Sequence, residues 1–177
     1  MILTSFVEER IFYRYLTPRW SHQPLSGAGA AMNGGRFNPK GVSALYLSAD
    51  PETALAELRQ DALLAPPATL AAYKVIVGDI VDFAGGFDSD RWSPDWSDWN
   101  CDWKYMSRIE RKMPQTWRLS NEIIGQQCRG LLFPSTRKPG GTNLVLFSDH
   151  LTQADKVEVH DPNGDLPRNQ LSWNRNS

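Results

Sequence analysis

A glycine-rich stretch that leads directly into an apolar strand constrains this chain more than any other feature. Residues 25–41 read LSGAGAAMNGGRFNPKG and contain five glycines. Because glycine adopts positive φ angles and lets a ligand approach the backbone closely, this stretch predicts a shaped loop rather than a linker. Val42 to Ser48 follow as a buried strand, and Asp50, Pro51 and Glu52 have the pattern of a helix start. The sequence therefore predicts a loop, a strand and a helix in direct succession.

The remaining patterns predict further strands and helices in one folded unit. The chain has 177 residues, 41% of them hydrophobic, which is enough for a single domain with its own core. We expect this domain to cover residues 1–160, followed by a polar tail over residues 161–177. Alternation and helical spacing predict strands at Phe12–Tyr15, Ala71–Val81 with a break at Gly78, Leu131–Phe133, Asn143–Phe147 and Lys156–His160, and helices from Pro51 to about Leu64 and over Gln115–Cys128.

Four tryptophans, at positions 92, 96, 99 and 103, lie four, three and four residues apart. Ser93 and Pro94 resemble a helix start, so the spacing predicts one helical face that carries all four rings. Aromatic residues at this spacing most often belong to a core. A partner-docking face and a base-stacking platform are the alternatives.

Charge and composition argue against several classes of protein. The formal net charge is -1 and the sequence pI is about 6.3, so no overall positive field favours nucleic acid or an anionic membrane. The acidic amino terminus does not resemble a signal peptide, and no apolar run is long enough to span a membrane. Neither the two cysteines nor the three histidines show metal-ligand spacing. We therefore expect a cytoplasmic protein with no metal and no direct nucleic-acid binding.

Three residues of the loop, strand and helix could together bind a phosphate-bearing ligand. Arg36 offers a planar fork of donors to a diphosphate, and glycine backbone amides can approach the same oxygens. Tyr46 adds a ring and a hydroxyl, and Glu57 lies at the edge of the apolar face of the expected helix. Alternatively, Arg36 pairs with a surface acid, Tyr46 fills the core and Glu57 is solvated. Spacing alone leaves both interpretations open.

A family resemblance bears on this choice. The run LSGAGAAMNGGRFNPKGVSALYLS, followed by TALAE, resembles the signature of the RES-domain family, and GLLFPSTR followed by GGTNLVLF resembles a later part of it. The resemblance covers Phe12 to about Phe147, whereas the stretch from Trp92 to Trp103 matches nothing in the family pattern. The family consists of toxins that bacteria pair with an antitoxin.

The resemblance implies an α+β protein with a compact ADP-ribosyltransferase-like fold, in which helices flank a mixed, split central β-sheet. It implies NAD+ as the substrate and a type II toxin–antitoxin system in which an Xre-type helix-turn-helix antitoxin blocks the NAD site. Glu57, Arg36 and Tyr46 are the expected catalytic residues. Carried over position by position, the resemblance implies an NAD site lined by Arg36, Tyr46, Glu57 and Ser135, with Arg14 and Asn143 as further contributors.

The chemistry of NAD+ agrees with this set of residues. Nicotinamide is cationic in NAD+ and departs neutral, so one carboxylate can suffice where an ordinary glycosidase needs two. We expect Glu57 to stabilise the oxocarbenium-like ribose and Arg36 to anchor the diphosphate. Ser135 is expected to be a ligand hydroxyl, because no histidine is placed to activate it as a nucleophile. The acceptor of ADP-ribose is left open among water, phosphate and a protein side chain. A non-catalytic module that binds a nucleotide or a partner in the same cleft is the alternative.

Overall fold

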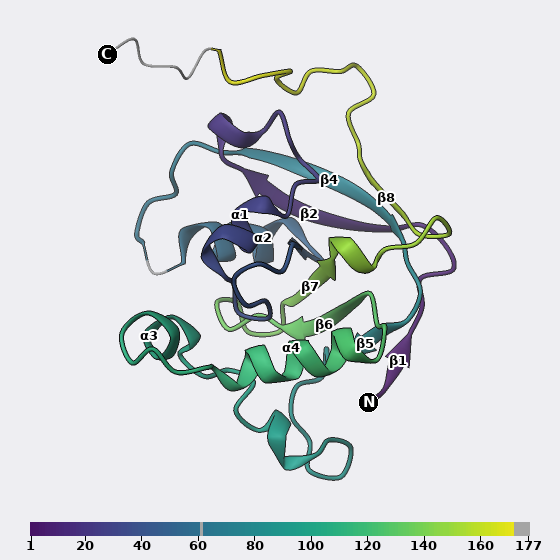
Figure 1. The fold of residues 1–177 in the computed structure, drawn as a ribbon. Helices are drawn as coiled ribbons and strands as arrows, with labels where there is room; N and C mark the ends of the chain where they lie inside the picture. The colour runs from purple at the N-terminus through teal and green to yellow at the C-terminus, as the bar shows by residue number, and fades with distance from the viewer. Residues whose placement is uncertain (61, 172–177) are drawn as a thin grey trace.

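The computed structural model describes residues 1–60 and 62–171. Within these residues, the strands are β1 (Leu3–Thr4), β2 (Arg10–Leu16), β3 (Ala44–Ser48), β4 (Thr69–Ile76), β5 (Ile80–Asp82), β6 (Gly130–Pro134), β7 (Thr142–Phe147) and β8 (Lys156–Val159). They form one mixed sheet in the order β1-β5-β6-β7-β3-β2-β4-β8 (Figure 1). Only β5 and β6 pair in parallel, and the other neighbours are antiparallel. The predicted strands are confirmed, including the break at Gly78 between β4 and β5.

The sheet narrows where β2 meets β3. These two strands share a single residue pair, Tyr13 with Ser48, whereas β2 pairs with β4 along its whole length. On the other side, β3 pairs with β7 from Ala44 to Ser48. The expected split of the sheet is therefore a junction made by one residue pair, and the strands on either side of this junction pair along more of their length. The α+β class is confirmed.

The helices are α1 (Ala28–Asn33), α2 (Pro51–Arg59), α3 (Trp103–Arg108) and α4 (Gln115–Gly125). At the start of α2, Asp50 accepts hydrogen bonds from the backbone N–H of Thr53 at 2.8 Å and from its hydroxyl at 2.6 Å, as the predicted cap requires. α2 is shorter than predicted because Gln60 has a φ of 51° and ends it. The glycine-rich stretch was predicted to be a shaped loop, but part of it, Ala28–Asn33, forms α1.

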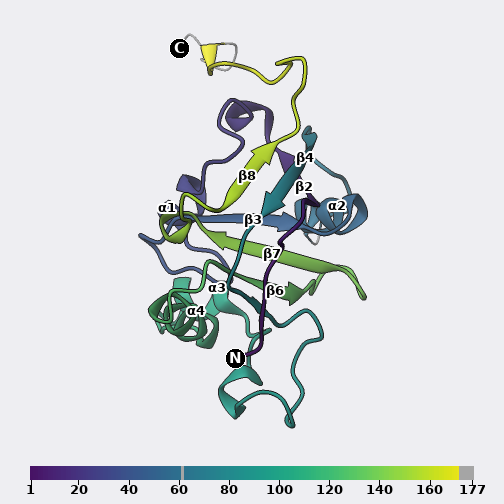
Figure 2. The ribbon, with the colours of Figure 1, turned by 90° about the vertical axis from the view of Figure 1, so that its right-hand side faces the viewer.

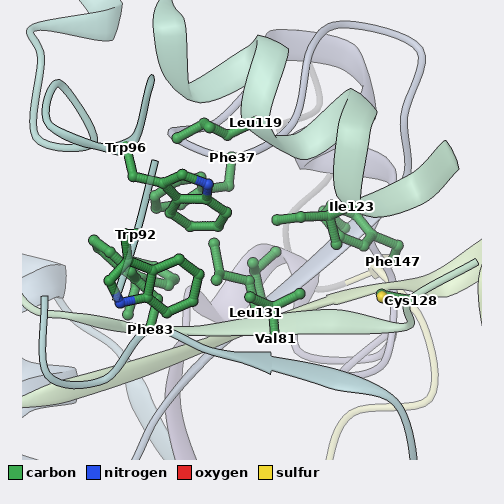
Figure 3. Packing of buried hydrophobic residues seen from close by; sticks show 13 residues of the cluster. Phe37, Val81, Phe83, Trp92, Trp96, Leu119, Ile123, Cys128, Leu131 and Phe147 are labelled. Atoms are coloured by element: carbon green, nitrogen blue, oxygen red, sulfur yellow. The ribbon is translucent and has the colours of Figure 1, made fainter. Parts of the chain in front are cut away.

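Two apolar clusters lie on opposite faces of the sheet. In β7, Val145 and Phe147 belong to one cluster while Leu144 and Leu146 belong to the other, so this central strand is buried on both faces. Figure 3 shows the first cluster, in which Leu119 and Ile123 of α4 face the sheet. Figure 2 shows α4 beside β6 and β7 and α2 near the β2–β3 junction. Leu166, in the expected tail, packs against the second cluster.

The prediction of one tryptophan-bearing helix is wrong. Residues 92–103, which we call the tryptophan segment, form a 3₁₀ turn at Pro94–Trp96 and further turns before α3 begins at Trp103. The N–H groups of Trp96, Ser97, Trp99 and Cys101 each bond to the carbonyl three residues earlier. The interspersed aspartates favour such turns over an α-helix. The expected core role is confirmed for Trp92 and Trp96, which are 7% and 1% exposed. Both rings pack against Phe83, with centroids 4.9 and 4.8 Å away.

Among the described residues, no helix has the length and apolar character needed to cross a bilayer.

Candidate active site

A cavity of about 520 Å³ opens where the sheet narrows. Its wall combines residues of β2, β3 and α2 with Arg36 of the glycine-rich stretch, residues 100–104, and the turn that follows β6. This volume falls within the range of small-molecule and cofactor sites. Arg14, Arg36, Tyr46, Glu57 and Asn143 all line it, so five of the six residues expected at the site share one cavity.

Glu57 is held by one of its two carboxylate oxygens. Its Oε1 accepts hydrogen bonds from Ser135 Oγ and from Asn143 Nδ2, both at 2.7 Å. Asn143 is itself oriented by Ser48, whose hydroxyl donates to Asn143 Oδ1 at 2.8 Å. Oε2 accepts no hydrogen bond from any residue in the described part of the chain. Glu57 is thus fixed in position while one oxygen remains available to a ligand.

Ser135 acts on Glu57 rather than on the cavity itself. Its hydroxyl donates to Glu57 and accepts from the backbone N–H groups of Arg137 and Lys138, each at 3.1 Å. The hydroxyl proton is therefore already donated to Glu57. Ser135 is 8% exposed and lies outside the described cavity lining. This geometry favours a positioning role over the ligand contact expected from the sequence.

The turn that carries Ser135 is tied to the start of α2. Lys138 Nζ lies 3.3 Å from Asp50 and 2.8 Å from Glu52. A Cβ added to Gly141 would stand 2.4 Å from Thr53 Oγ1, so only glycine allows the turn to approach this closely. These contacts fix the distance between Ser135 and the helix that carries Glu57.

Arg36 extends from the glycine-rich stretch toward the tryptophan segment. Its Nη1 donates to the carbonyl oxygens of Cys101 at 3.2 Å and Trp99 at 3.5 Å, and its Nη2 donates to Thr136 Oγ1 at 3.4 Å. Burial lowers the pKa of Arg36, and the neighbouring Cys101 and Glu57 side chains oppose that shift. A guanidinium stays charged under such conditions. Arg36 therefore brings a positive charge to the side of the cavity near Glu57.

Tyr46 holds the loop that presents Arg36. Its hydroxyl donates to Asn38 Oδ1 at 2.7 Å and accepts from the N–H of Phe37 at 2.9 Å. Burial raises the pKa of Tyr46 far above its ordinary value, so the hydroxyl keeps its proton. Asn38 is fully buried. Because the hydroxyl is engaged by the loop, the ring of Tyr46 is the part left to face a ligand.

Three cations that line the cavity have no carboxylate partner among the residues that the structure describes. Burial lowers the pKa of Arg14 on β2, and the neighbouring Tyr73 opposes this shift. Lys104 Nζ donates to the neutral side chain of Gln60 at 2.7 Å. Within residues 1–60 and 62–171, Arg14, Arg36 and Lys104 form no ion pair with a carboxylate. An anionic ligand would supply the missing counter-charge.

Several lining residues were missed by the sequence analysis. Asn100 to Lys104 form a wall of the cavity, although the tryptophan segment was interpreted as a core helix. The Asp and Asn residues between the tryptophans could have indicated that this stretch is not a core helix, because these residue types favour turns and loops. Tyr13 and Tyr15 also line the cavity, on either side of Arg14. Their position next to Arg14 in the sequence FYRY could have indicated that they lie at the site.

Groups of three or more His, Cys, Asp or Glu placed to hold a metal ion are absent from the described residues. The arrangement is instead one oriented carboxylate beside several cations and aromatic rings, which suits an anionic ligand with a reactive centre near Glu57.

Comparisons with known proteins agree with this description. The profile of the RES domain matches residues 11–169. Toxin Res of Yersinia enterocolitica is 29% identical over 141 residues, which cover 79% of this chain and 85% of that protein. A chain in the crystal structure of the M. tuberculosis MbcT–MbcA toxin–antitoxin complex has the same fold, with a TM-score of 0.58 and 19% identity over 89% of this chain and 84% of that one.

Proposed function

This chain belongs to the RES-domain family, and we propose that it is the toxin of a toxin–antitoxin pair that cleaves NAD+ between nicotinamide and ribose. The observation that carries the proposal is the pairing of one half-engaged carboxylate, Glu57, with cations that lack carboxylate partners in the described structure, in a cavity of about 520 Å³. A dinucleotide supplies both the diphosphate and the ribose that such a site would bind.

The diphosphate would occupy the cationic side of the cavity. Arg36 is the principal anchor in this proposal, because its guanidinium is already oriented and has donors beyond those used for its three present contacts. Arg14 and Lys104 add positive charge along the same cavity. The aromatic rings of Tyr46 and its neighbours in the wall would support the nicotinamide or its ribose.

Glu57 would act on the nicotinamide ribose through its available oxygen. As the bond to nicotinamide lengthens, positive charge develops on the ribose, and a fixed carboxylate stabilises this charge without reorganising. Nicotinamide takes the bonding electron pair and departs neutral, so no general acid has to protonate it. Ser135 and Asn143 would keep Glu57 in place through Oε1. One carboxylate can therefore suffice.

ADP-ribose would then pass to water, to phosphate or to a protein side chain. Which acceptor is used depends on what reaches the reacting ribose carbon after nicotinamide leaves. The cations of the cavity are compatible with phosphate as well as with the diphosphate of the substrate. A parallel assay with and without phosphate separates the hydrolase from the phosphorylase, and labelled ADP-ribose on protein identifies a transferase.

A toxin of this kind needs a neutralising partner. One protein with the same fold comes from a toxin–antitoxin complex. We extend the proposal to an antitoxin that covers the cavity described above, and the family resemblance favours the Xre helix-turn-helix type.

The experiment that tests the proposal measures NAD+ loss and nicotinamide release by the purified protein. We expect turnover by the wild type and almost none by Glu57→Gln, which keeps the shape but loses the charge. Glu122→Gln, on the exposed surface of α4, is the matched control and should behave as the wild type. Binding of NAD+ without turnover by the wild type would favour the non-catalytic module. Unchanged turnover by Glu57→Gln would overturn the assignment of Glu57.

A further inference from the structure

The tryptophan segment is firmly anchored at its first part. Trp92 and Trp96 are buried against Phe83, and the half-buried ring of Trp99 packs edge-on against the same ring with centroids 5.6 Å apart (Figure 3 shows the first two rings). Phe83 follows directly after β5 and belongs to the cluster beneath α4. The position of Trp99 is therefore set by the core of the protein.

The same segment meets Arg36 through backbone atoms. The carbonyl oxygens of Trp99 and Cys101 both accept from Arg36 Nη1. An arginine side chain has several rotatable bonds, so fixing its guanidinium removes conformations that would otherwise be lost on ligand binding. Beyond Cys101, the chain continues along the cavity to Lys104, which bonds to Gln60 after α2.

We propose that the tryptophan segment positions Arg36 for the ligand. In this proposal Trp99, whose ring is held by the core, fixes the backbone carbonyls to which the guanidinium bonds. The segment thus belongs to the active site, although the rings of Trp92, Trp96 and Trp99 lie in and around the core. This inference rests on the proposed function for its effect on NAD+, whereas the coupling between Trp99 and Arg36 is a property of the protein alone.

Kinetics of Trp99→Ala test the effect on the substrate. Removing the ring breaks the contact with Phe83 that ties this part of the segment to the core, so the carbonyls of Trp99 and Cys101 are held less firmly. We expect KM for NAD+ to rise about tenfold with kcat changed less than about threefold, since Arg36 contributes to binding before the reaction. Trp99→Phe keeps an aromatic ring against Phe83 and should restore most of the affinity. Trp20→Ala is the control, because Trp20 is 54% exposed and lies outside the described cavity wall.

A double-substitution cycle distinguishes positioning from general destabilisation. If Trp99 acts through Arg36, Trp99→Ala should raise KM much less in an Arg36→Ala protein than in the wild type. Independent effects on KM, or a fall in kcat with KM unchanged, would overturn the inference. The same cycle in equilibrium unfolding needs no substrate: non-additive changes support the coupling and additive changes overturn it. If the wild type neither binds nor cleaves NAD+, the proposed function fails and the unfolding cycle still decides this inference.

Discussion

The hydroxyl of Ser135 donates to Oε1 of Glu57 at 2.7 Å, which joins the turn after β6 to the helix that follows β3. These residues are 78 positions apart in the chain. The bond directs Ser135 toward the carboxylate and not toward the cavity, so Ser135 orients the residue that we propose to perform the chemistry. Asn143 adds a second donor to the same oxygen.

Ser135→Ala should therefore lower kcat more than it raises KM. The substitution removes a donor to Glu57 and the acceptor for two backbone N–H groups of the turn, so the carboxylate loses its fixed position. Misplacement of a catalytic group by about 1 Å can cost about a hundredfold in rate, and we expect a loss of about ten- to a hundredfold. Steady-state NAD+ cleavage measures it. Ser89→Ala, at an exposed loop position, is the control. A large rise in KM with kcat unchanged would instead indicate direct contact between Ser135 and the ligand.

Most of the strands were predictable from the sequence because their apolar alternation is local. β7, for example, is flanked by the glycines at 140 and 141 and carries the run Leu144 to Phe147, which is buried on both faces. The start of α2 was also predictable from Asp50 and Pro51, since capping depends on a few neighbouring residues. Its early end at Gln60 was not, because a positive φ at a glutamine depends on tertiary surroundings.

The site was predictable only in part, for a similar reason. Family resemblance and residue chemistry predicted one shared site for Arg36, Tyr46 and Glu57, and all three line the cavity. The contacts that orient them join distant parts of the chain: Arg36 reaches Cys101, 65 positions away, through a backbone carbonyl. Every residue type carries a backbone carbonyl, so no sequence pattern reveals which carbonyl accepts from Arg36. Helical spacing misled the interpretation of the tryptophans because the core requires only that their rings meet at Phe83.

Gly35→Ala should destabilise the protein and weaken NAD+ binding. A Cβ at this position would lie 2.4 Å from Asn38 Oδ1 and 2.6 Å from the hydroxyl of Tyr46, so the loop that presents Arg36 would have to move. We expect a loss of about 1–3 kcal/mol in the free energy of unfolding, which is typical of overpacking. Denaturant unfolding and the KM for NAD+ check this prediction.

Gly29→Ala is the matched control for Gly35→Ala. Gly29 lies within α1, and a Cβ there would meet nothing within 4 Å. Alanine favours a helix over glycine by about 1 kcal/mol, so this variant should be as stable as the wild type or more stable. Equal losses of stability in the two variants would contradict the close packing of Gly35 against Tyr46.

The stability of the protein should fall in acid partly through Asp155. Burial acts to raise the pKa of this carboxyl, but hydrogen bonds from Thr152 and Gly78 and the charge of Arg129 hold the pKa below its usual value. The ion pair joins Arg129 Nε and Asp155 Oδ2 at 2.8 Å. A carboxyl with a lowered pKa in the folded state contributes stability that is present above its unfolded pKa, about 3.9, and is lost as the pH falls through the folded pKa.

Asp155→Asn tests this contribution through its pH dependence. The amide cannot ionise, so the variant should be less stable than the wild type at pH 7, and the difference should shrink as the pH is lowered below about 4. Thermal unfolding from pH 7 down to pH 3 measures the change. Asp149→Asn removes an exposed carboxylate and controls for the change in net charge. A constant difference between Asp155→Asn and the wild type over this range would show that the ionised carboxylate is not what stabilises the contact with Arg129.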